Sequence, residues 1–290
     1  MDIAEKQKII PTSVTFADER PVRHVLNVSG GKDSSALALL MAGRIKGLEQ
    51  FRLDDMEYVF CDTQKELPET YEYLARLEAE LGSKVIHLNA KAGFDHWHKV
   101  FNGYLPSPQN RWCTKMLKLK PFETHVGADN VVSYVGLRAD EDRIGYISKK
   151  PNIKTRYPLK EAGIDLDGVI KVLEDSGLGL PTFMEWGRTN SGCTFCFFQT
   201  PYEWVKLLQT YPDLFEEAMT YESIDENDPN KQFTWMEAGP LSRLKDEKEQ
   251  RRILDAGIRE TSSHTKQPRL TDVFSGRKAK ANRSCLMCQK

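Results

Sequence analysis

The chain has no long apolar run and no excess of basic charge. In its 290 residues no stretch approaches the roughly 18 consecutive apolar residues of a membrane-spanning helix, and the N-terminal segment has no apolar core of the signal-peptide type. We therefore expect a cytoplasmic protein without a membrane partner. Lys and Arg total 41 against 42 Asp and Glu. This balance argues against a dominant sequence-independent nucleic-acid binder, although it is compatible with a local basic groove.

Cysteine is also scarce, with six residues in the chain. In a reducing compartment these are poor disulfide candidates, so metal binding, redox chemistry and packing are the first roles to consider. The sequence contains no internal repeat and no low-complexity tract. Hydrophobic residues make up 40% and charged residues 29% of the chain, a composition that excludes a disordered protein and is sufficient for a sizeable core.

Short apolar runs alternate with helical patterns over the first half of the chain. Strands are expected at 24–28, 56–61, 84–88 and 131–136, with helices at 34–44 and 67–81. This alternation predicts an α/β fold with a Rossmann-like parallel sheet and helices on both faces. We divide the chain into a leader (1–22), a sheet domain (23–165) and a mainly helical C-terminal region (166–290). The last region is expected to have helices at 164–178, 202–222 and 240–257.

The loop after the first predicted strand, SGGKDSS, is the most informative segment. Gly30 and Gly31 allow backbone N–H groups to approach an anion closely, and the start of the following helix adds about half a positive charge. Three serines add hydroxyl groups at the same point: Ser29, Ser34 and Ser35. We therefore expect an oxyanion-binding loop, which differs from a Walker loop because the Gly-Lys-Ser/Thr ending is absent. The plainer interpretation is a glycine turn before a capped helix.

This loop resembles the SGGxDS loop of the PP-loop ATP pyrophosphatases, a group of adenine nucleotide α-hydrolase folds. Three further segments resemble the phosphoadenosine phosphosulfate (PAPS) reductase family. Residues 61–70 (CDTQKELPET) resemble its DTG…PET segment, 111–121 (RWCTKMLKLKP) its RWC…LK..P segment, and 135–143 (VGLRADEDR) its G-[IL]-R-x-x-E-x-x-R segment. The resemblance covers about two-thirds of the chain, and it implies that ATP is bound and cleaved between its α and β phosphates.

The resemblance also implies roles for charged residues at the carboxyl ends of the predicted strands. Lys32, Arg138 and Arg143 are cations suited to phosphates, and Asp33 and Asp62 are carboxylates suited to Mg²⁺. We assign catalytic roles to Lys32, Asp33, Arg138 and Arg143. The nucleotide-binding set comprises Ser29, Gly30, Gly31, Asp33, Ser34, Ser35, Asp62, Thr63, Gly136 and Arg138. The alternative for the two arginines is a solvated helix start in which they pair with Asp140 and Glu141.

The cysteines form two Cys-x2-Cys pairs, Cys193 with Cys196 and Cys285 with Cys288. Two such pairs suggest four thiolates on one metal. Their separation is much longer than the roughly 15–20 residues of a compact zinc ribbon, so zinc is compatible but not required. Cys61 ends a predicted strand and is expected to be a packed small hydrophobe.

The family resemblance offers a second arrangement. Members that act on adenosine phosphosulfate bind a [4Fe–4S] cluster through a Cys-Cys pair and a downstream Cys-x2-Cys pair, and DNA phosphorothioation proteins of the family carry similar cysteines. Three cysteines match this layout: Cys113, Cys193 and Cys196. Thr114 stands where the second member of the Cys-Cys pair would be. Either Cys285 or Cys288 is then the fourth ligand, or one iron of the cluster has no protein ligand. We favour an iron–sulfur cluster over zinc.

The tail motif Glu-Cys-Gly-Leu/Ile-His, which supplies the nucleophile in sulfonucleotide reductases, is absent. The resemblance therefore favours the ATP-using branch. We expect adenylylation of a nucleic acid or nucleotide with release of pyrophosphate. Sulfur from a cysteine desulfurase-type donor then displaces AMP. The protein is compatible with an oligomer. The alternatives are a thiol-dependent PAPS or adenosine phosphosulfate reductase, with Cys285 or Cys288 as nucleophile, and a nucleotide-binding accessory protein of a phage-defence or CRISPR system.

Overall fold

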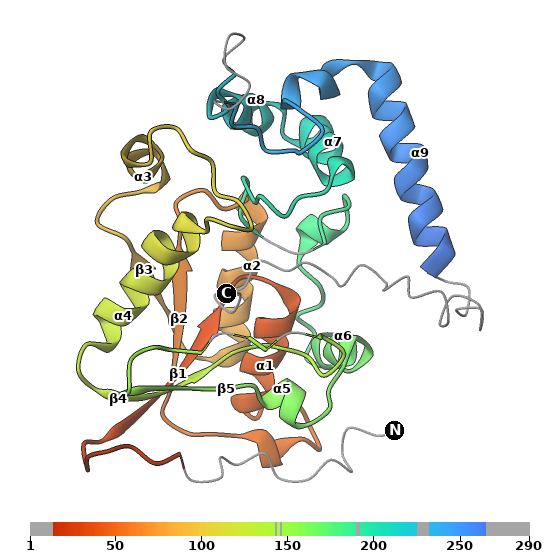
Figure 1. Ribbon diagram of the computed structural model, residues 1–290. Helices are drawn as coiled ribbons and strands as arrows, with labels where there is room; N and C mark the ends of the chain where they lie inside the picture. Colours follow the sequence, from red (N-terminus) through yellow and green to blue (C-terminus); the bar gives the residue numbers. More distant parts are fainter. Residues whose placement is uncertain (1–13, 143, 146, 190–191, 225–231, 265–290) are drawn as a thin grey trace, which may run out of the picture.

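A five-stranded parallel sheet forms the centre of the first half of the molecule (Figure 1). The computed structural model describes residues 14–142, 144–145, 147–189, 192–224 and 232–264. The strand order is β3-β2-β1-β4-β5, and every neighbouring pair is parallel. The strands are β1 (Val22–Val28), β2 (Met56–Asp62), β3 (Val85–Asn89), β4 (Asn130–Tyr134) and β5 (Ile153–Arg156).

Alternate residues of the central strands face two different apolar cores. In β1, Leu26 and Val28 face the core that contains α1, whereas Val25 faces the core that contains α4. In β4, Val132 faces the first core and Val131 faces the second of these two. Both faces of the sheet are thus covered, which is why these strands are near-continuous apolar runs in the sequence. The predicted Rossmann-like α/β fold is confirmed.

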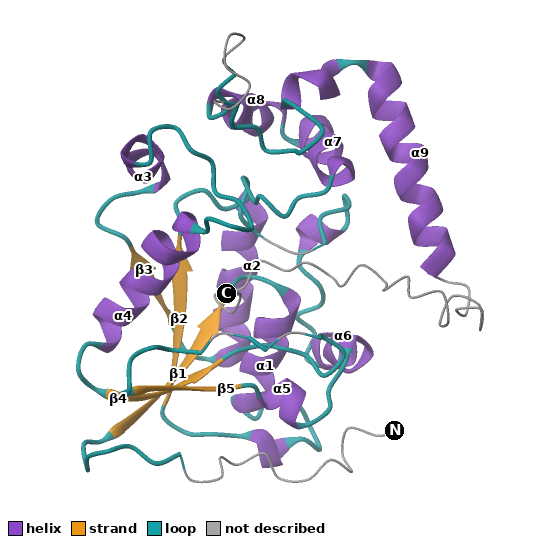
Figure 2. Ribbon diagram, in the orientation of Figure 1, coloured by secondary structure: helices purple, strands orange, loops and turns teal. Residues whose placement is uncertain are grey.

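Helices lie on both sides of the sheet, as Figure 2 shows. On one side are α1 (Lys32–Met41), α2 (Pro68–Leu81) and α6 (Leu166–Asp175), and on the other is α4 (Lys120–Val126). Every residue of α1 is buried, as expected for a central helix between the sheet and α6. Short elements connect them: η2 (Glu49–Phe51), α3 (Phe94–Val100), η3 (Thr114–Leu119), α5 (Pro158–Glu161) and η4 (Thr182–Met184).

A separate aromatic core lies beyond the carboxyl ends of the strands (Figure 1). It includes Trp204, Phe215 and Trp235 from the C-terminal region, together with Trp112 and Leu117 from the first half of the chain. The surrounding helices are α7 (Pro201–Thr210), α8 (Pro212–Thr220), η6 (Leu241–Lys245) and α9 (Glu247–His264). The C-terminal region is therefore partly helical, and the stretch expected at 202–222 is two helices separated by Tyr211.

The predicted division at residue 165 stays a prediction. Residues of α6 belong to the core of the sheet, and residues 94–117 contribute to the aromatic core. The fifth strand was not predicted, because Ile153 is the single apolar residue of its sequence IKTR. None of the described helices is long and apolar enough to cross a membrane.

Candidate functional site

The loop after β1 is shaped by its glycines and serines. Gly30 has a φ of 70°, and a Cβ atom there would lie 2.5 Å from Thr70 Cγ2, so both the backbone conformation and the space require glycine. The Ser34 hydroxyl accepts a hydrogen bond from the Ser29 N–H at 3.0 Å, and Ser35 Oγ donates to the Gly31 carbonyl at 3.0 Å. No side chain caps the start of α1. The buried N-terminus of α1 is thus arranged as an anion-binding helix start would be.

A buried cluster of charges lies at the start of α1. Arg138 is 2% exposed, and its Nη1 donates to Asp33 Oδ1 at 2.9 Å. Lys32 Nζ lies 3.6 Å from the other carboxylate oxygen of Asp33. Arg138 Nε also donates to Asp140 at 2.9 Å, and its backbone N–H donates to Glu141 at 3.1 Å. Arg138 therefore does pair with Asp140 and Glu141, as the plainer interpretation expected, but in a buried site and with Asp33 as a third partner.

The pKa values of this cluster reflect its ion pairs. Burial alone would lower the pKa of Arg138, but its bonds to Asp140 and Asp33 raise that pKa above its ordinary value. Burial likewise opposes ionisation of Asp140, yet the guanidinium of Arg138 lowers the pKa of this carboxyl group. Arg138 and Asp140 thus form an ion pair at neutral pH beside the loop after β1.

Gly136 brings the loop after β4 against the loop after β1. A Cβ atom at Gly136 would lie 2.8 Å from the backbone of Asp33 and from the nitrogen of Ser34. These two loops follow adjacent strands, and the strand order reverses between them. Such a switch point is where open parallel sheets bind ligands.

The carboxyl end of β2 supplies two further predicted residues. Asp62 Oδ1 accepts hydrogen bonds from the Gln64 N–H at 2.7 Å and the Tyr71 hydroxyl at 2.9 Å. Thr63 Oγ1 donates to Glu66 Oε1 at 2.7 Å. Burial first, and then the bond to Asp62, raise the pKa of Tyr71 above its usual range. Asp62 therefore presents a hydrogen-bonded carboxylate, whereas Thr63 is turned toward the next loop.

The loop that carries Cys193 lies against the loop after β2. Glu66 and Cys193 form an antiparallel bridge, and the Leu67 N–H donates to the Gly192 carbonyl at 2.7 Å. The Thr70 hydroxyl donates to the same carbonyl at 3.3 Å. A Cβ atom at Gly192 would lie 2.2 Å from Thr70 Oγ1. Thr70 therefore contacts both Gly30 of the loop after β1 (here called the phosphate loop) and Gly192 of the loop that carries Cys193 (the cysteine loop).

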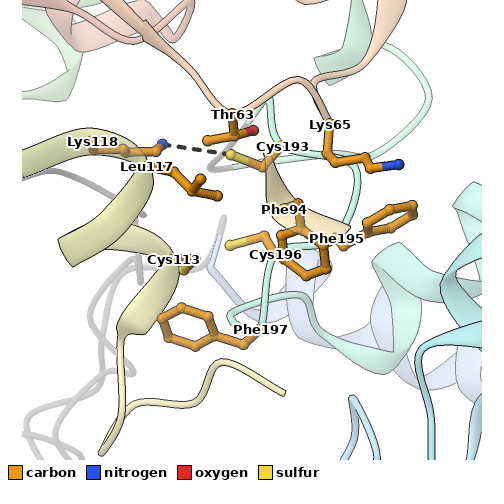
Figure 3. A pocket seen from close by; sticks show the side chains of 10 residues that line it. All are labelled: Thr63, Lys65, Phe94, Cys113, Leu117, Lys118, Cys193, Phe195, Cys196 and Phe197. Atoms are coloured by element: carbon orange, nitrogen blue, oxygen red, sulfur yellow. Dashed lines mark hydrogen bonds between the residues drawn. The ribbon is translucent and has the colours of Figure 1, made fainter. Parts of the chain in front are cut away.

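Three of the predicted metal-binding cysteines line one pocket of about 370 Å³ (Figure 3). Cys113 comes from the segment before η3, and Cys193 and Cys196 come from the loop before α7. Cys193 Sγ lies 3.5 Å from Lys118 Nζ and 3.3 Å from Glu66 Oε1. The structure thus brings together thiols that are far apart in the sequence.

Cysteine thiolates are donors that suit either an iron–sulfur cluster or zinc. Within the described part of the chain, no three His, Cys, Asp or Glu side chains are placed to hold one metal ion together. A polynuclear cluster distributes its thiolate ligands over several irons, so its ligands need not meet at one point. Two apolar rings in the pocket wall, Phe94 and Phe195, would limit the access of water.

Several predicted residues lie outside the described part of the chain: Arg143, Cys285 and Cys288. Other residues of the site were not predicted. Thr70 lies within the PET segment and Lys118 within the RWC…LK..P segment, so both had a sequence signal but no assigned role. Arg188, which is buried and donates to the Cys193 carbonyl, had none.

A family model described as the phosphoadenosine phosphosulfate reductase domain matches residues 23–172. The chain belongs to the PAPS reductase domain family. The matched residues include the loop after β1, the carboxyl ends of β2 and β4, and Cys113, whereas Cys193 and Cys196 follow the match.

Curated relatives are similar over part of their length. An uncharacterized protein of Methanocaldococcus jannaschii is 28% identical over 65% of this chain and 39% of its own length. An uncharacterized nin region protein of Escherichia phage lambda is 26% identical over 45% of this chain and 52% of its own. The tRNA-specific 2-thiouridylase MnmA of Streptococcus uberis is 30% identical over 44% of this chain and 37% of its own length. The chain therefore spans about half or less of the length of these relatives.

Among solved structures, a PAPS reductase from Candida auris in complex with phosphate is similar. It has a TM-score of 0.45 and 14% sequence identity, and the match covers 59% of this chain and 81% of that one.

Proposed function

We propose that this PAPS reductase family member binds ATP and Mg²⁺ at the loop after β1 and activates a nucleic acid or nucleotide for sulfur transfer. The observation that carries the proposal is the position of Thr70. Its methyl group lies against Gly30 of the phosphate loop, and its hydroxyl bonds Gly192 of the cysteine loop. A site suited to a nucleotide and a site suited to sulfur or a metal cluster are therefore neighbours.

The residues have distinct parts in this reaction. The backbone of the loop and the α1 start bind the polyphosphate, and Lys32 and Arg138 offset its charge. Asp33 and Asp62 are the carboxylates at hand for Mg²⁺. An oxygen of the acceptor attacks the α-phosphorus of ATP, the bond to the bridging oxygen breaks, and pyrophosphate leaves. A sulfide-level sulfur nucleophile then bonds to the activated carbon, and AMP leaves with the carbon–oxygen bond pair.

The pocket thiols serve the second half of the reaction. Cys113, Cys193 and Cys196 are the residues that would hold a [4Fe–4S] cluster, with a tail cysteine as the further ligand. Such a cluster supplies iron sites with affinity for sulfur. The similarity to a tRNA 2-thiouridylase supports this branch, because that relative is named for placing sulfur in a nucleic acid.

The test is product analysis. Protein incubated with ATP, Mg²⁺ and tRNA should release AMP and pyrophosphate in equal amounts, and Asp62→Asn should abolish the release. Asp54→Asn is the matched control, because the side chain of Asp54 is 74% exposed and pairs with Arg52, away from the loop after β1. Production of ADP alone, or no binding of ATP, contradicts the proposal.

A thiol-dependent sulfonucleotide reductase is the second candidate, and the family match itself favours it. In that case PAPS incubated with the protein and a thiol reductant releases sulfite. Release that survives in the double variant Cys285→Ser, Cys288→Ser would exclude these two thiols as the nucleophile of such a reductase. A protein that binds ATP without any turnover would instead be an accessory nucleotide-binding protein.

A further inference from the structure

Two adjacent phenylalanines lie beside the cysteine pocket without joining a core. Phe197 lines the pocket, and its ring centroid is 4.3 Å from that of Phe198. Both side chains are half-buried, and neither belongs to any of the three apolar cores formed by the described residues. Phe94 and Phe195, also at the pocket, are by contrast part of the aromatic core. The pair therefore has apolar surface that the fold does not use.

A guanidinium group lies over both rings. Arg111 Cζ is 5.9 Å from the ring centroid of Phe197 and 5.0 Å from that of Phe198. Arg111 is two residues before Cys113, so this arrangement joins the two chain segments that supply the pocket thiols. Together Arg111, Phe197 and Phe198 form a set of flat groups, here named the stacking triad, at the edge of the pocket.

The segment that contains Arg111 is locally basic although the chain as a whole has a net charge of −1. No Asp or Glu occurs from residue 96 to residue 122, and the segment carries the cations Lys99, Arg111, Lys115, Lys118 and Lys120. Lys115 and Lys120 are exposed, and neither forms an ion pair with another described residue. Lys120 Nζ lies 5.6 Å from the ring centroid of Trp97. The segment that supplies Arg111 and Cys113 is thus positively charged.

We propose that the stacking triad binds an unpaired base of a single-stranded nucleic acid, with Lys115 and Lys120 at the flanking phosphates. The inference rests on the proposed function, since it names the acceptor and the surface that presents it to the pocket. Every base has a flat face that stacks on aromatic rings and on guanidinium groups, whereas phosphates require cations. Flat groups at the edge of the pocket, together with exposed cations on the segment that carries Arg111, match both needs. A paired base cannot enter, because its faces are already stacked.

Binding is measured by fluorescence anisotropy with a 5′-fluorescein 12-nucleotide RNA of mixed sequence, in the absence of ATP. Phe198→Leu should raise the Kd by about fivefold or more, because it keeps an apolar side chain but removes the π face. Phe198→Trp should stay within about twofold of the unsubstituted protein. The Kd is also measured for the same sequence as single-stranded DNA and as a duplex. The two single strands show whether RNA or DNA binds more tightly, and the duplex should bind more weakly than either. Equal binding of the single strand and duplex, or no effect of Phe198→Leu, overturns the proposal.

The phosphate contacts have their own readout. Lys115→Gln should reduce the slope of log Kd against log salt by about 0.7, the value for one phosphate contact with a single strand. Lys84→Gln makes the same charge change at the amino end of β3, whereas the pocket lies beyond the carboxyl end of β2, and it should leave the slope unchanged. An equal change in both variants contradicts the placement of the nucleic acid.

Calorimetry with ATP separates the two proposals. ATP should bind Phe198→Leu and Lys115→Gln as it binds the unsubstituted protein. If ATP binds and the RNA does not, the stacking triad has no such role while the proposed function stands. If ATP fails to bind the unsubstituted protein, the proposed function fails whatever the RNA does.

Discussion

The loop after β1 is fixed by backbone groups, short hydroxyl side chains and buried ion pairs, whereas the cysteine pocket is assembled from two segments that meet on an aromatic core. Ser29, Ser34 and Ser35 bond within seven residues of one another. Cys113 and Cys193, by contrast, reach the same pocket from positions 80 residues apart in the sequence. The first site is held by contacts within one short segment, and the second depends on how two regions pack.

The two sites should therefore respond differently to substitution. A substitution at the phosphate loop leaves a buried charge or a clash with the backbone, so it should lower both the free energy of unfolding and the affinity for a nucleotide. A change at the cysteine pocket leaves the sheet intact, so its cost falls on the thiols. Each of the following tests asks whether the two sites separate in this way.

The largest effect is expected at Arg138. Arg138→Ala would remove the buried cation that Asp33 and Glu141 share, and should lower the free energy of unfolding by about 3–5 kcal/mol. Urea unfolding followed by circular dichroism measures this. Arg52→Ala is the control, because the side chain of Arg52 is 62% exposed in its ion pair with Asp54 and should cost at most about 1 kcal/mol. Similar costs in the two variants would show that the buried cluster does not stabilise the loop.

The second largest effect is expected in the alkylation rates of the cysteine thiols. Burial raises the pKa of Cys61 to about 12, so its thiolate fraction at pH 8 is about a thousandfold below that of a thiol at an ordinary pKa near 9. In metal-free protein at pH 8, iodoacetamide should therefore modify Cys113 and Cys193 long before Cys61, as peptide mass spectrometry would show. Raising the pH toward 12 should raise the Cys61 rate, and early modification of Cys61 at pH 8 would contradict its buried position on β2.

Gly136→Ala should have an intermediate effect on stability. Its new methyl group would lie 2.8 Å from the backbone of Asp33, which cannot move without shifting the start of α1. Overpacking of this kind costs about 1–3 kcal/mol, and we expect ATP affinity to fall at least tenfold in calorimetry. Gly47→Ala is the control: it has open space around it, so it should lose some stability through its φ of 82° but keep its ATP affinity.

Thr70 should give the smallest and most selective effects. Thr70→Val keeps the shape beside Gly30 but removes the hydrogen bond to the Gly192 carbonyl, at a cost of about 1 kcal/mol. It should speed alkylation of Cys193 and leave ATP affinity unchanged. Thr70→Ser keeps the hydroxyl and removes the methyl group. This variant should therefore change the ATP affinity and leave the alkylation rate of Cys193 unchanged. If both variants change both readouts equally, the two sites are a single unit and the comparison fails.

The sheet was predictable because local sequence fixes it. The central strands β1, β2 and β4 are short apolar runs with buried residues on both faces, and such runs are visible without any knowledge of tertiary contacts. The strand β5 was missed because its sequence, IKTR, carries a single apolar residue. The break between α7 and α8 was missed because both helices are amphipathic and follow one another directly.

The candidate site was predictable where a motif is contiguous. The serine–glycine loop and the Gly136–Arg138 segment have a spacing that points to one chemistry, and the parallel topology brings them together. The partners of Cys193 were not predictable in the same way. Lys118 and Arg188 reach it only through the packing of η3 and the loop before α7, which no local pattern encodes.

The bridge between Glu66 and Cys193 joins the carboxyl end of β2 to the loop that carries the thiol. Three residues separate this bridge from Asp62, whose carboxylate accepts the Gln64 N–H. A shift of the backbone at Asp62 is therefore expected to move the backbone of Cys193 through a short stretch of chain, without any change in how the helices pack.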